Sequence, residues 1–284
     1  VTLGENASII ANSRDGVALG VFVFNKGKFE AAKDLVINVS ADDGSQWAAG
    51  VLAQGTGSEA VLNGAVISAT EGSTASYAIY TYNNGSVVGN AGKYNIYGNI
   101  LNNSGSFIEG WVSTASTAET NISLEEASYW KVTGDSNLTH LHNDNSIVDM
   151  THDSNTFSTL TVDNLSGENG VIKMDIDASQ NSLNSDKLYV TDTLTGTQYI
   201  DLYEVNGYTP VGEEGVGTVL ATVNNHNGSF AAVDGEGTLY WKRYELDHQD
   251  TADTSGNYTK DWYLKQVTNI DQPTTSTDTI LAAN

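Results

Sequence analysis

The stretch Thr159–Val190, TLTVDNLSGENGVIKMDIDASQNSLNSDKLYV, decides how this chain is expected to fold. Apolar and polar residues alternate in Leu160–Leu165 and again in Val171–Ile176, and a Ser-Gly-Glu-Asn-Gly turn separates the two segments. A loop rich in Ser and Asn then leads to a third apolar run, Leu188–Val190. Alternation with a period of two, bounded by Gly, Asn and Asp, is typical of short β-strands. The stretch therefore predicts three strands joined by turns.

Upstream of this stretch, residues 17–125 repeat with a spacing of 30 residues. The first strand of each unit begins at Val17, Trp47, Tyr77 and Phe107, and the second strand begins at Leu35, Ala65 and Asn95. A fixed period of about 20 to 50 residues indicates a solenoid, whose units bury their apolar faces against each other. Because Gly and β-branched residues are frequent, we expect an all-β fold, a right-handed parallel β-helix. Its inward positions are predicted to be Val36, Val66 and Ile96 or their immediate neighbours.

An antiparallel β-sandwich is the alternative architecture, since it also has short strands at regular spacing. Residue types recur at a single lag over four units here, which sandwich strands do not require. The register therefore favours the solenoid.

Several motifs occur in order between Tyr129 and Val267, and together they resemble the autochaperone segment of pertactin-like autotransporters. In that family the segment ends the secreted passenger. The positions that carry the resemblance are Leu165, Gly167, Gly170, Asp177, Asp186, Leu188, Val190, Gly196 and Trp262. Two features depart from the family pattern: the paired glycines are replaced by Gly167-Glu168-Asn169-Gly170, and Asp247–Tyr258 is an insertion. These departures leave the local turn geometry open.

The resemblance implies three parts: β-helix rungs in residues 1–128, an autochaperone and cap region in residues 129–267, and a linker in residues 268–284. The linker would lead to the chain's own translocator barrel in the outer membrane, which lies outside this sequence. In the family, the C-terminal hairpins are thought to fold first after crossing that membrane and to template the rest. Because the chain begins with Val1, we expect a fragment or a mature piece.

The composition limits the partners of this chain. It has 12 Lys and Arg against 35 Asp and Glu, a net charge of −23, which disfavours nucleic acid and anionic lipid surfaces. Charged residues are only 17% of the chain, below the roughly 25% usual for soluble domains, so Ser, Thr, Asn and Gly must form much of the surface. Cys is absent, which excludes disulfides and thiolate metal sites.

Three patterns are candidates for catalytic or metal sites. Gly134-Asp135-Ser136 suggests a serine nucleophile, but a rung turn is the better interpretation because no glycine-rich elbow follows. His140-x-His142 places two imidazoles on one strand face, with His152 nearby, yet no third ligand has the spacing of a zinc motif. The Asp-rich turns lack the calcium-binding repeats. We therefore expect no enzyme activity, no metal and no cofactor.

A cluster of tyrosines is the candidate adhesive surface: Tyr77, Tyr80, Tyr82, Tyr94 and Tyr97. Half of them must face outward on an alternating strand, and tyrosine is a favoured contact residue at interfaces and carbohydrate sites. The alternative, that they only form ladders with neighbouring rungs, stays open.

The function expected from the resemblance is the membrane-proximal passenger of an adhesin on the surface of a Gram-negative-type bacterium, or secreted from it. Its partners would be a host-cell receptor or glycan, or the same chain on other bacterial cells. The alternative function is the stalk or body of a secreted β-helix enzyme that processes polysaccharide or carries a protease.

Overall fold

The computed structural model describes the chain from residue 1 to residue 269 with internal gaps, namely residues 1–14, 16–41, 47–70, 76–89, 94–102, 105–112, 114, 120–152, 156–178, 183–205, 211–233, 242–252 and 258–269. Strands and turns make up nearly all of this part of the chain, and its one helical element is the 3-10 turn η1, Glu213–Gly215. No helix among these residues is long and apolar enough to cross a membrane. The linker expected in residues 268–284 lies outside the described residues from position 270 onward.

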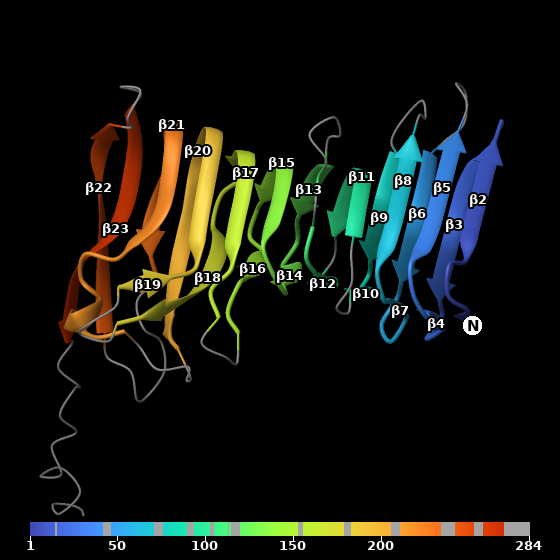
Figure 1. The fold of residues 1–284 in the computed structure, drawn as a ribbon, viewed down its shortest axis with the longest axis horizontal. Helices are drawn as coiled ribbons and strands as arrows, with labels where there is room; N and C mark the ends of the chain where they lie inside the picture. The colour runs from blue at the N-terminus through green and yellow to red at the C-terminus, as the bar shows by residue number, and fades with distance from the viewer. Residues whose placement is uncertain are drawn as a thin grey trace, which may run out of the picture.

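The strands wind into a parallel β-helix that runs along the long axis of the molecule (Figure 1). The first face stacks β3 (Val17–Phe24), β6 (Trp47–Gln54), β9 (Ser76–Tyr82), the C-terminal half of β11 (Tyr94–Asn102), β13 (Thr120–Leu124), β15 (Ser136–Asn143), β17 (Thr159–Ser166), β20 (Lys187–Glu204) and β21 (Val219–Ala232). All of these neighbours pair in parallel, as the solenoid prediction requires.

Two further faces complete the coil. The second face stacks β1 (Thr2–Leu3), β4 (Lys28–Ala31), β7 (Glu59–Leu62), β10 (Ser86–Gly89), β12 (Phe107–Gly110), β14 (Tyr129–Val132), β16 (Ile147–Asp149), β18 (Gly170–Asp177) and the C-terminal parts of β20 and β21. The third face stacks β2 (Ser8–Ser13), β5 (Leu35–Ala41), β8 (Ala65–Thr70) and the N-terminal half of β11. These parallel pairings confirm the predicted β-helix.

The core consists of ladders of equivalent side chains, one from each rung. On the first face the inward ladder is Val21, Val51, Ile79, Ile100, Ile122, Leu141, Leu165 and Leu194, all of them buried. Parallel pairing in register places such residues about 4.8 Å apart, so each apolar side chain packs on its neighbours above and below. The continuous apolar interior therefore depends on keeping every rung in register.

The predicted spacing of 30 residues holds only for the first rungs. Val17 pairs with Trp47, but Tyr77 pairs with Ala49 rather than with Trp47. Phe107 is not the next copy of Tyr77, because it lies in β12 on the second face. Among the described residues the third face ends at β11, and the next rungs close with fewer residues, since Asn99 pairs with Asn121 and Asn121 with His140. The spacing grows again toward the C-terminal end, where Leu160 pairs with Leu188 and Leu188 with Ala221.

The inward positions of the third face are the neighbours of the residues singled out in the sequence. Ile37 and Ile67 are fully buried and pair with each other, whereas Val36 and Val66 are half-buried. The side chain of Ile96 lies outside the described residues. Its backbone pairs with Ile67, one residue away from the predicted register.

The coil ends with a change of strand direction at its C-terminal end (Figure 1). β21 pairs in parallel with β20, but on its other side it pairs antiparallel with β23 (Tyr258–Asn269). β22 (Lys242–Ala252) then pairs antiparallel with β23. This hairpin confirms the predicted C-terminal cap. A second, shorter antiparallel pair joins β19 (Asn184–Ser185) to β18.

Candidate functional site

The glycines of the motif lie where successive rungs touch backbone to backbone. A Cβ atom on Gly167, where φ is +110°, would lie 2.4 Å from the carbonyl oxygen of Asn143. A Cβ atom on Gly196, where φ is +81°, would lie 2.2 Å from the carbonyl oxygen of Gly167. Gly170 is packed as tightly, against the side chains of Asn143 and Gln198. Only glycine fits at this corner, because of both the left-handed backbone and the missing space.

Two buried amides join the rungs at the same corner. Asn143 and Gln198 are fully buried, and the Asn143 Nδ2 donates to the Gln198 Oε1 at 2.9 Å. The Gln198 Nε2 donates to the carbonyl oxygens of Asn143, at 3.1 Å, and Gly167, at 2.8 Å. The two bonds between Asn143 and Gln198 join residues that are 55 apart in the sequence. A slip of register would leave buried polar groups without partners, so the pair fixes the alignment of the rungs.

The apolar residues of the motif belong to the core and the cap. Leu165, Leu188 and Val190 are buried in the interior of the coil. Trp262 lies on β23, where its ring meets Phe230 edge-on with 5.4 Å between the ring centroids. Its other neighbour is His248 of β22, with ring centroids 4.6 Å apart. Trp262 thus packs between the last rung and the strand that covers it.

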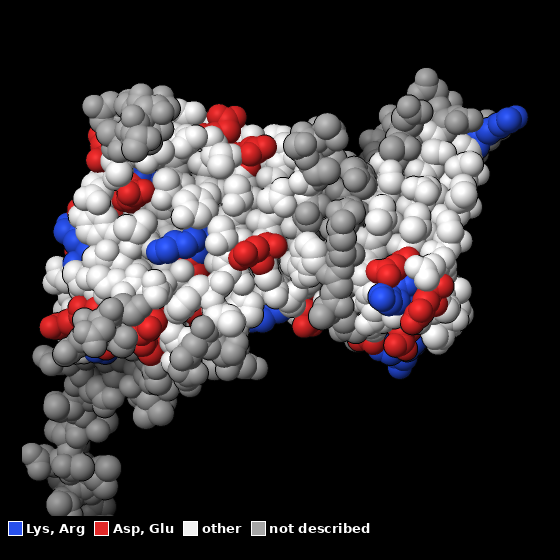
Figure 2. All heavy atoms as spheres, viewed as in Figure 1, with Lys and Arg blue, Asp and Glu red and all other residues white. Residues whose placement is uncertain are grey.

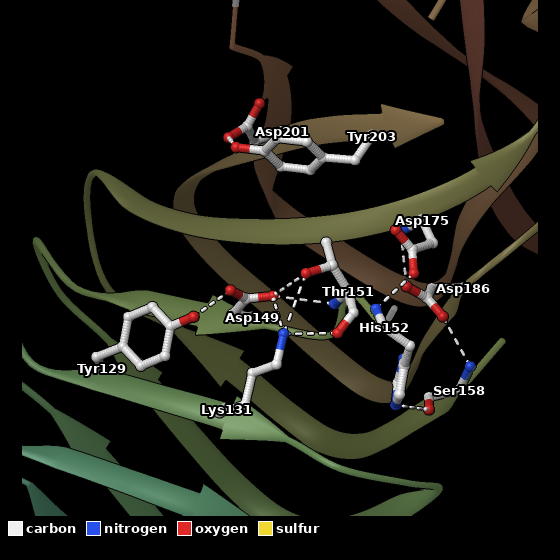
Figure 3. Close-up of polar contacts among 10 residues, drawn as sticks. All are labelled: Tyr129, Lys131, Asp149, Thr151, His152, Ser158, Asp175, Asp186, Asp201 and Tyr203. Atoms are coloured by element: carbon white, nitrogen blue, oxygen red, sulfur yellow. Dashed lines mark hydrogen bonds and ion pairs between the residues drawn. The ribbon is translucent and has the colours of Figure 1, made fainter. Parts of the chain in front are cut away.

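Asp186 lies at the centre of a buried polar network (Figure 3). Its two carboxylate oxygens each accept a backbone N–H, from Ser158 and from Asp175, both at 2.7 Å. Burial raises the pKa of Asp186 to about 7, the two N–H donors act against this rise, and the charge of Asp175 adds to it. Asp186 therefore ties the loop before β17 to strand β18 through one carboxyl group.

A second carboxylate, Asp149, belongs to the same region of the second face. The Lys131 ammonium donates to the Asp149 Oδ1 at 2.9 Å, and the Thr151 hydroxyl donates to the same atom at 2.7 Å. The Tyr129 hydroxyl donates to the Asp149 Oδ2 (Figure 3). Burial raises the pKa of Asp149, but the hydrogen bonds from Tyr129, Thr151 and Lys131 outweigh it and lower the pKa below its ordinary value. This carboxylate is held in its charged form.

His152 connects the two carboxylate centres. Its backbone N–H donates to the Asp175 Oδ2 at 2.6 Å, and its Nε2 lies 3.3 Å from the Ser158 Oγ. Burial lowers the pKa of His152, and the positive charge of Lys131 lowers it further. We call Lys131, Asp149, His152, Asp175 and Asp186 the acid network. On β20 nearby, the Tyr203 hydroxyl donates to Asp201 at 2.6 Å (Figure 3).

The sequence indicated only part of the acid network. Asp186 was among the motif positions, but Asp177 lies at the end of β18 opposite Asn184, two residues beyond Asp175. Lys131 was missed, because nothing in its local sequence marks it. The pairing of β14 with β16 brings it opposite Asp149.

The residues considered for a zinc site and for a protease site lie in rungs and turns of the coil. His140 and His142 face the same outer side, as predicted, but His152 lies in the acid network. No group of three metal-binding side chains occurs among the described residues. Ser136 is buried, and its Oγ accepts the Val112 N–H at 3.1 Å and donates to the Gly134 carbonyl at 3.0 Å. These bonds are those of a turn.

The candidate adhesive tyrosines of β9 form one outward cluster. Tyr77 and Tyr80 have ring centroids 5.1 Å apart, and Tyr80 and Tyr82 6.3 Å apart. Trp47 of the preceding rung, which the sequence did not single out, lies 5.9 Å from Tyr80. Burial raises the pKa of Tyr80, and the neighbouring Tyr77, Tyr82 and Glu125 add to the rise. The side chains of Tyr94 and Tyr97 lie outside the described residues.

The same outer surface continues toward the N-terminus as exposed apolar rings. Phe22 and Phe24 of β3 are stacked, with ring centroids 4.9 Å apart, and are 42% and 57% exposed. Figure 2 shows charged side chains scattered over one side of the molecule, with uncharged surface between them. The surface thus has the sparse charge that the composition indicated.

Comparison with known proteins places part of the chain in a family. Residues 136–240 match the model of the autochaperone domain type 1. Among solved structures, the Haemophilus influenzae Hap adhesin matches with 16% identity over 84% of this chain and a TM-score of 0.39, and the chain spans 25% of that protein's length. No curated protein matches the sequence. The family match covers the glycine corner and most of the acid network, so residues 136–240 resemble the autochaperone segment that the sequence motifs indicated.

Proposed function

We propose that this chain is the membrane-proximal part of an autotransporter adhesin, in which the autochaperone segment promotes folding and display and the upstream rungs support attachment. The observation that carries the folding role is the closure of the coil by β23 and β22 directly after the matched segment. An open end of a β-helix presents unpaired N–H and C=O groups, which invite aggregation. A finished end gives the next rung a surface on which to form.

The outermost strand of the cap supports this role. Among the described residues β22 pairs with β23 alone, and the charged Arg243, Glu245 and Asp247 alternate along it with Tyr244 and Leu246, which pack against the core. Lys260 and Lys265 of β23 form ion pairs with Asp250, at 3.0 Å, and Asp247, at 3.4 Å. Charged side chains on an edge strand discourage pairing with another chain. The cap is therefore suited to end the sheet and to stay in solvent.

The attachment role is supported by the outward aromatic cluster around Tyr80. Its partner would be a host-cell receptor or glycan, or another copy of the chain on a neighbouring bacterium, and the chain would sit on the outer surface of a Gram-negative cell beside its own translocator domain. The Lys131 ammonium and the carboxylates of Asp149 and Asp186 are occupied by structural hydrogen bonds. This occupancy supports a non-enzymatic passenger region.

Reciprocal truncations test the folding role. We expect residues 129–284 to fold alone and to unfold cooperatively, because they contain the matched segment and the cap. Residues 1–159 should aggregate or lack a β-sheet spectrum, because their last rung is uncovered. Circular dichroism and sedimentation measure both. A soluble, monomeric 1–159 chain with an intact β-sheet spectrum would contradict the proposal.

Attachment is tested with the same two chains. Labelled full chain and labelled residues 129–284 are incubated with epithelial cells and with the producing bacteria, and bound label is counted. Binding by the full chain alone would place adhesion in the rungs before Tyr129. Absence of binding by both chains would refute the attachment role while leaving the folding role intact.

A further inference from the structure

A trough of about 370 Å³ crosses the outer side of β11, β13, β15 and β17 on the first face. Two outward ladders line it. One ladder runs Tyr77, Asn99, Asn121, His140 and Asn164, and the other runs Leu101, Ser123, His142 and Ser166. Tyr77 stands at one end of it, His140 and His142 lie toward the other end, and Asn164 and Ser166 line that far end. We call this feature the outer trough.

One end of the outer trough is aromatic. Tyr77 lines it directly, and Tyr80 and Trp47 extend the aromatic surface, with ring centroids 5.1 Å from Tyr77 to Tyr80 and 6.4 Å from Tyr77 to Trp47. Partly exposed rings of this kind offer a flat apolar surface with a polar tip. Such a surface fits the C–H face of a sugar ring.

The middle and far end offer paired donors and acceptors. The Asn121 Nδ2 donates to the Asn99 Oδ1 at 2.9 Å, so these two amides are held in a fixed orientation. The His142 Nδ1 lies 3.0 Å from the Ser166 Oγ, which fixes that imidazole in the same way. Amides, hydroxyls and imidazoles accept and donate at once, as the hydroxyl groups of a sugar do. Preorganised polar groups of this kind favour binding because less side-chain freedom is lost.

The spacing of the ladders points to an extended ligand. Equivalent residues on neighbouring strands repeat about every 4.8 Å across the trough. Successive pyranose rings of an extended glycan advance by a comparable distance, so each ring can meet one rung. The volume of the trough falls within the roughly 300 to 1,000 Å³ of ligand sites.

Other ligand classes fit less well. A peptide that adds to a sheet edge needs a free strand, but β13 and β15 are each paired on both sides. Among the described residues no Lys or Arg lines the trough, whereas Glu125 does, so sulfated or acidic polymers would meet a negative charge. The chemistry therefore selects an uncharged polyhydroxyl ligand.

We propose that the outer trough binds a neutral oligosaccharide, with Tyr77 and Tyr80 stacking on one ring and Asn121 and His140 bonding the hydroxyl groups of the next. This inference rests on the proposed attachment role and assigns it a site and a ligand class. It needs neither metal nor cofactor, since every contact comes from described side chains.

The test is a glycan array probed with the full chain, carrying neutral, sialylated and sulfated glycans, followed by calorimetric titration of the strongest neutral glycan. Asn121→Ala is expected to weaken binding about tenfold, as the loss of one well-placed hydrogen bond does. Asn225→Ala is the matched control, because Asn225 lies on the same ladder two rungs past the trough, opposite Thr193. His140→Ala, at an exposed position, provides a second variant whose fold is expected to be unchanged.

The outcomes separate this inference from the attachment role. Weaker neutral-glycan binding by Asn121→Ala and His140→Ala, with Asn225→Ala unchanged and circular dichroism intact, supports the site. Binding of anionic glycans only, or equal binding by all variants, overturns it. If the full chain attaches to cells and the trough variants attach equally well, the attachment role stands and the glycan site is refuted. If the chain binds neutral glycans through the trough but attaches to no cell, the site stands and the attachment role is refuted.

Discussion

The upstream rungs and the autochaperone region share the β-helix architecture but differ in the size of the side chains buried in its interior. Between β3 and β9 the interior is rich in alanine: Ala18, Ala31, Ala41, Ala48, Ala53, Ala60, Ala65, Ala69 and Ala78 are all buried. From β15 onward large side chains take over, among them Leu141, Met150, Leu160, Leu165, Ile172, Met174, Leu188, Leu194 and Ile200. Apolar burial contributes about 0.8 kcal/mol per CH₂ group, so each later rung gains more from burial.

The two regions also differ in their buried polar groups. The acid network and the Asn143–Gln198 pair lie in the later rungs, where each links segments that are far apart in the sequence. Buried polar groups of this kind are satisfied in only one register. The later rungs therefore have both a larger apolar gain and a mechanism that excludes misalignment, which is what a folding template requires.

The C-terminal end of the coil adds a further difference. There, Trp262 and Leu264 of β23 are buried against the last rung. The comparison of the two regions predicts that folding starts in the later rungs, and the following variants test this difference.

The largest effect is expected from a matched pair of leucines. Leu165 and Leu35 are both fully buried, one in each region, and truncation of either to Ala should cost about 3 to 4 kcal/mol in the free energy of unfolding. Leu165→Ala should mainly slow refolding, because its rung forms early, whereas Leu35→Ala should mainly speed unfolding. Stopped-flow fluorescence measures both rates. Equal slowing of refolding by both variants would show that the two regions fold together.

A second pair compares two glycines with positive φ. Gly196→Ala should cost about 2 to 3 kcal/mol, because φ is +81° and the new Cβ would overlap the Gly167 carbonyl. Gly55→Ala, where φ is +90° and nothing lies within 4 Å, should cost only about 1 kcal/mol from backbone strain. Urea denaturation gives both values. Similar losses would indicate that the crowding at the corner relaxes freely.

The acid network predicts a pH dependence. The pKa of Asp186 is raised from 3.8 to about 7 in the folded chain, so the folded state binds this proton more tightly than the unfolded state. Its contribution to stability is fully present below pH 3.8 and is lost as pH rises to about 7. Asp149, whose pKa is lowered, acts in the opposite direction and loses its contribution as pH falls below 3.8.

Asp186→Asn removes the first of these dependences. The difference in unfolding free energy between wild type and variant should shrink by about 1 kcal/mol or more as pH rises from 4 to 7. Denaturation at several pH values measures it. A difference that stays constant over this range would show that Asp186 does not titrate there.

The smallest effect is expected on the outer surface. Tyr82 is 40% exposed, so Tyr82→Ser should change the unfolding free energy by less than about 0.5 kcal/mol. Loss of cooperativity in this variant would mean that the tyrosine cluster is part of the fold rather than a surface available for attachment.

The sequence by itself determined the fold class and the position of the autochaperone segment. Strand alternation in Leu160–Leu165 and Val171–Ile176 depends only on local period, and both segments are strands in the structure. The motif glycines could also be found from the sequence, because a corner without room for a Cβ atom requires glycine.

Only the tertiary structure decided the register and the neighbours across rungs. The turns of the coil use fewer residues between β9 and β17 and more again after β17, and a repeat of constant length cannot express this change. Lys131 meets Asp149, and Tyr77 meets Trp47 and the outer trough, because parallel pairing brings together residues from different rungs. Local sequence specifies the strands, but contacts between rungs depend on loop lengths and packing, and these are fixed only when the chain closes on itself.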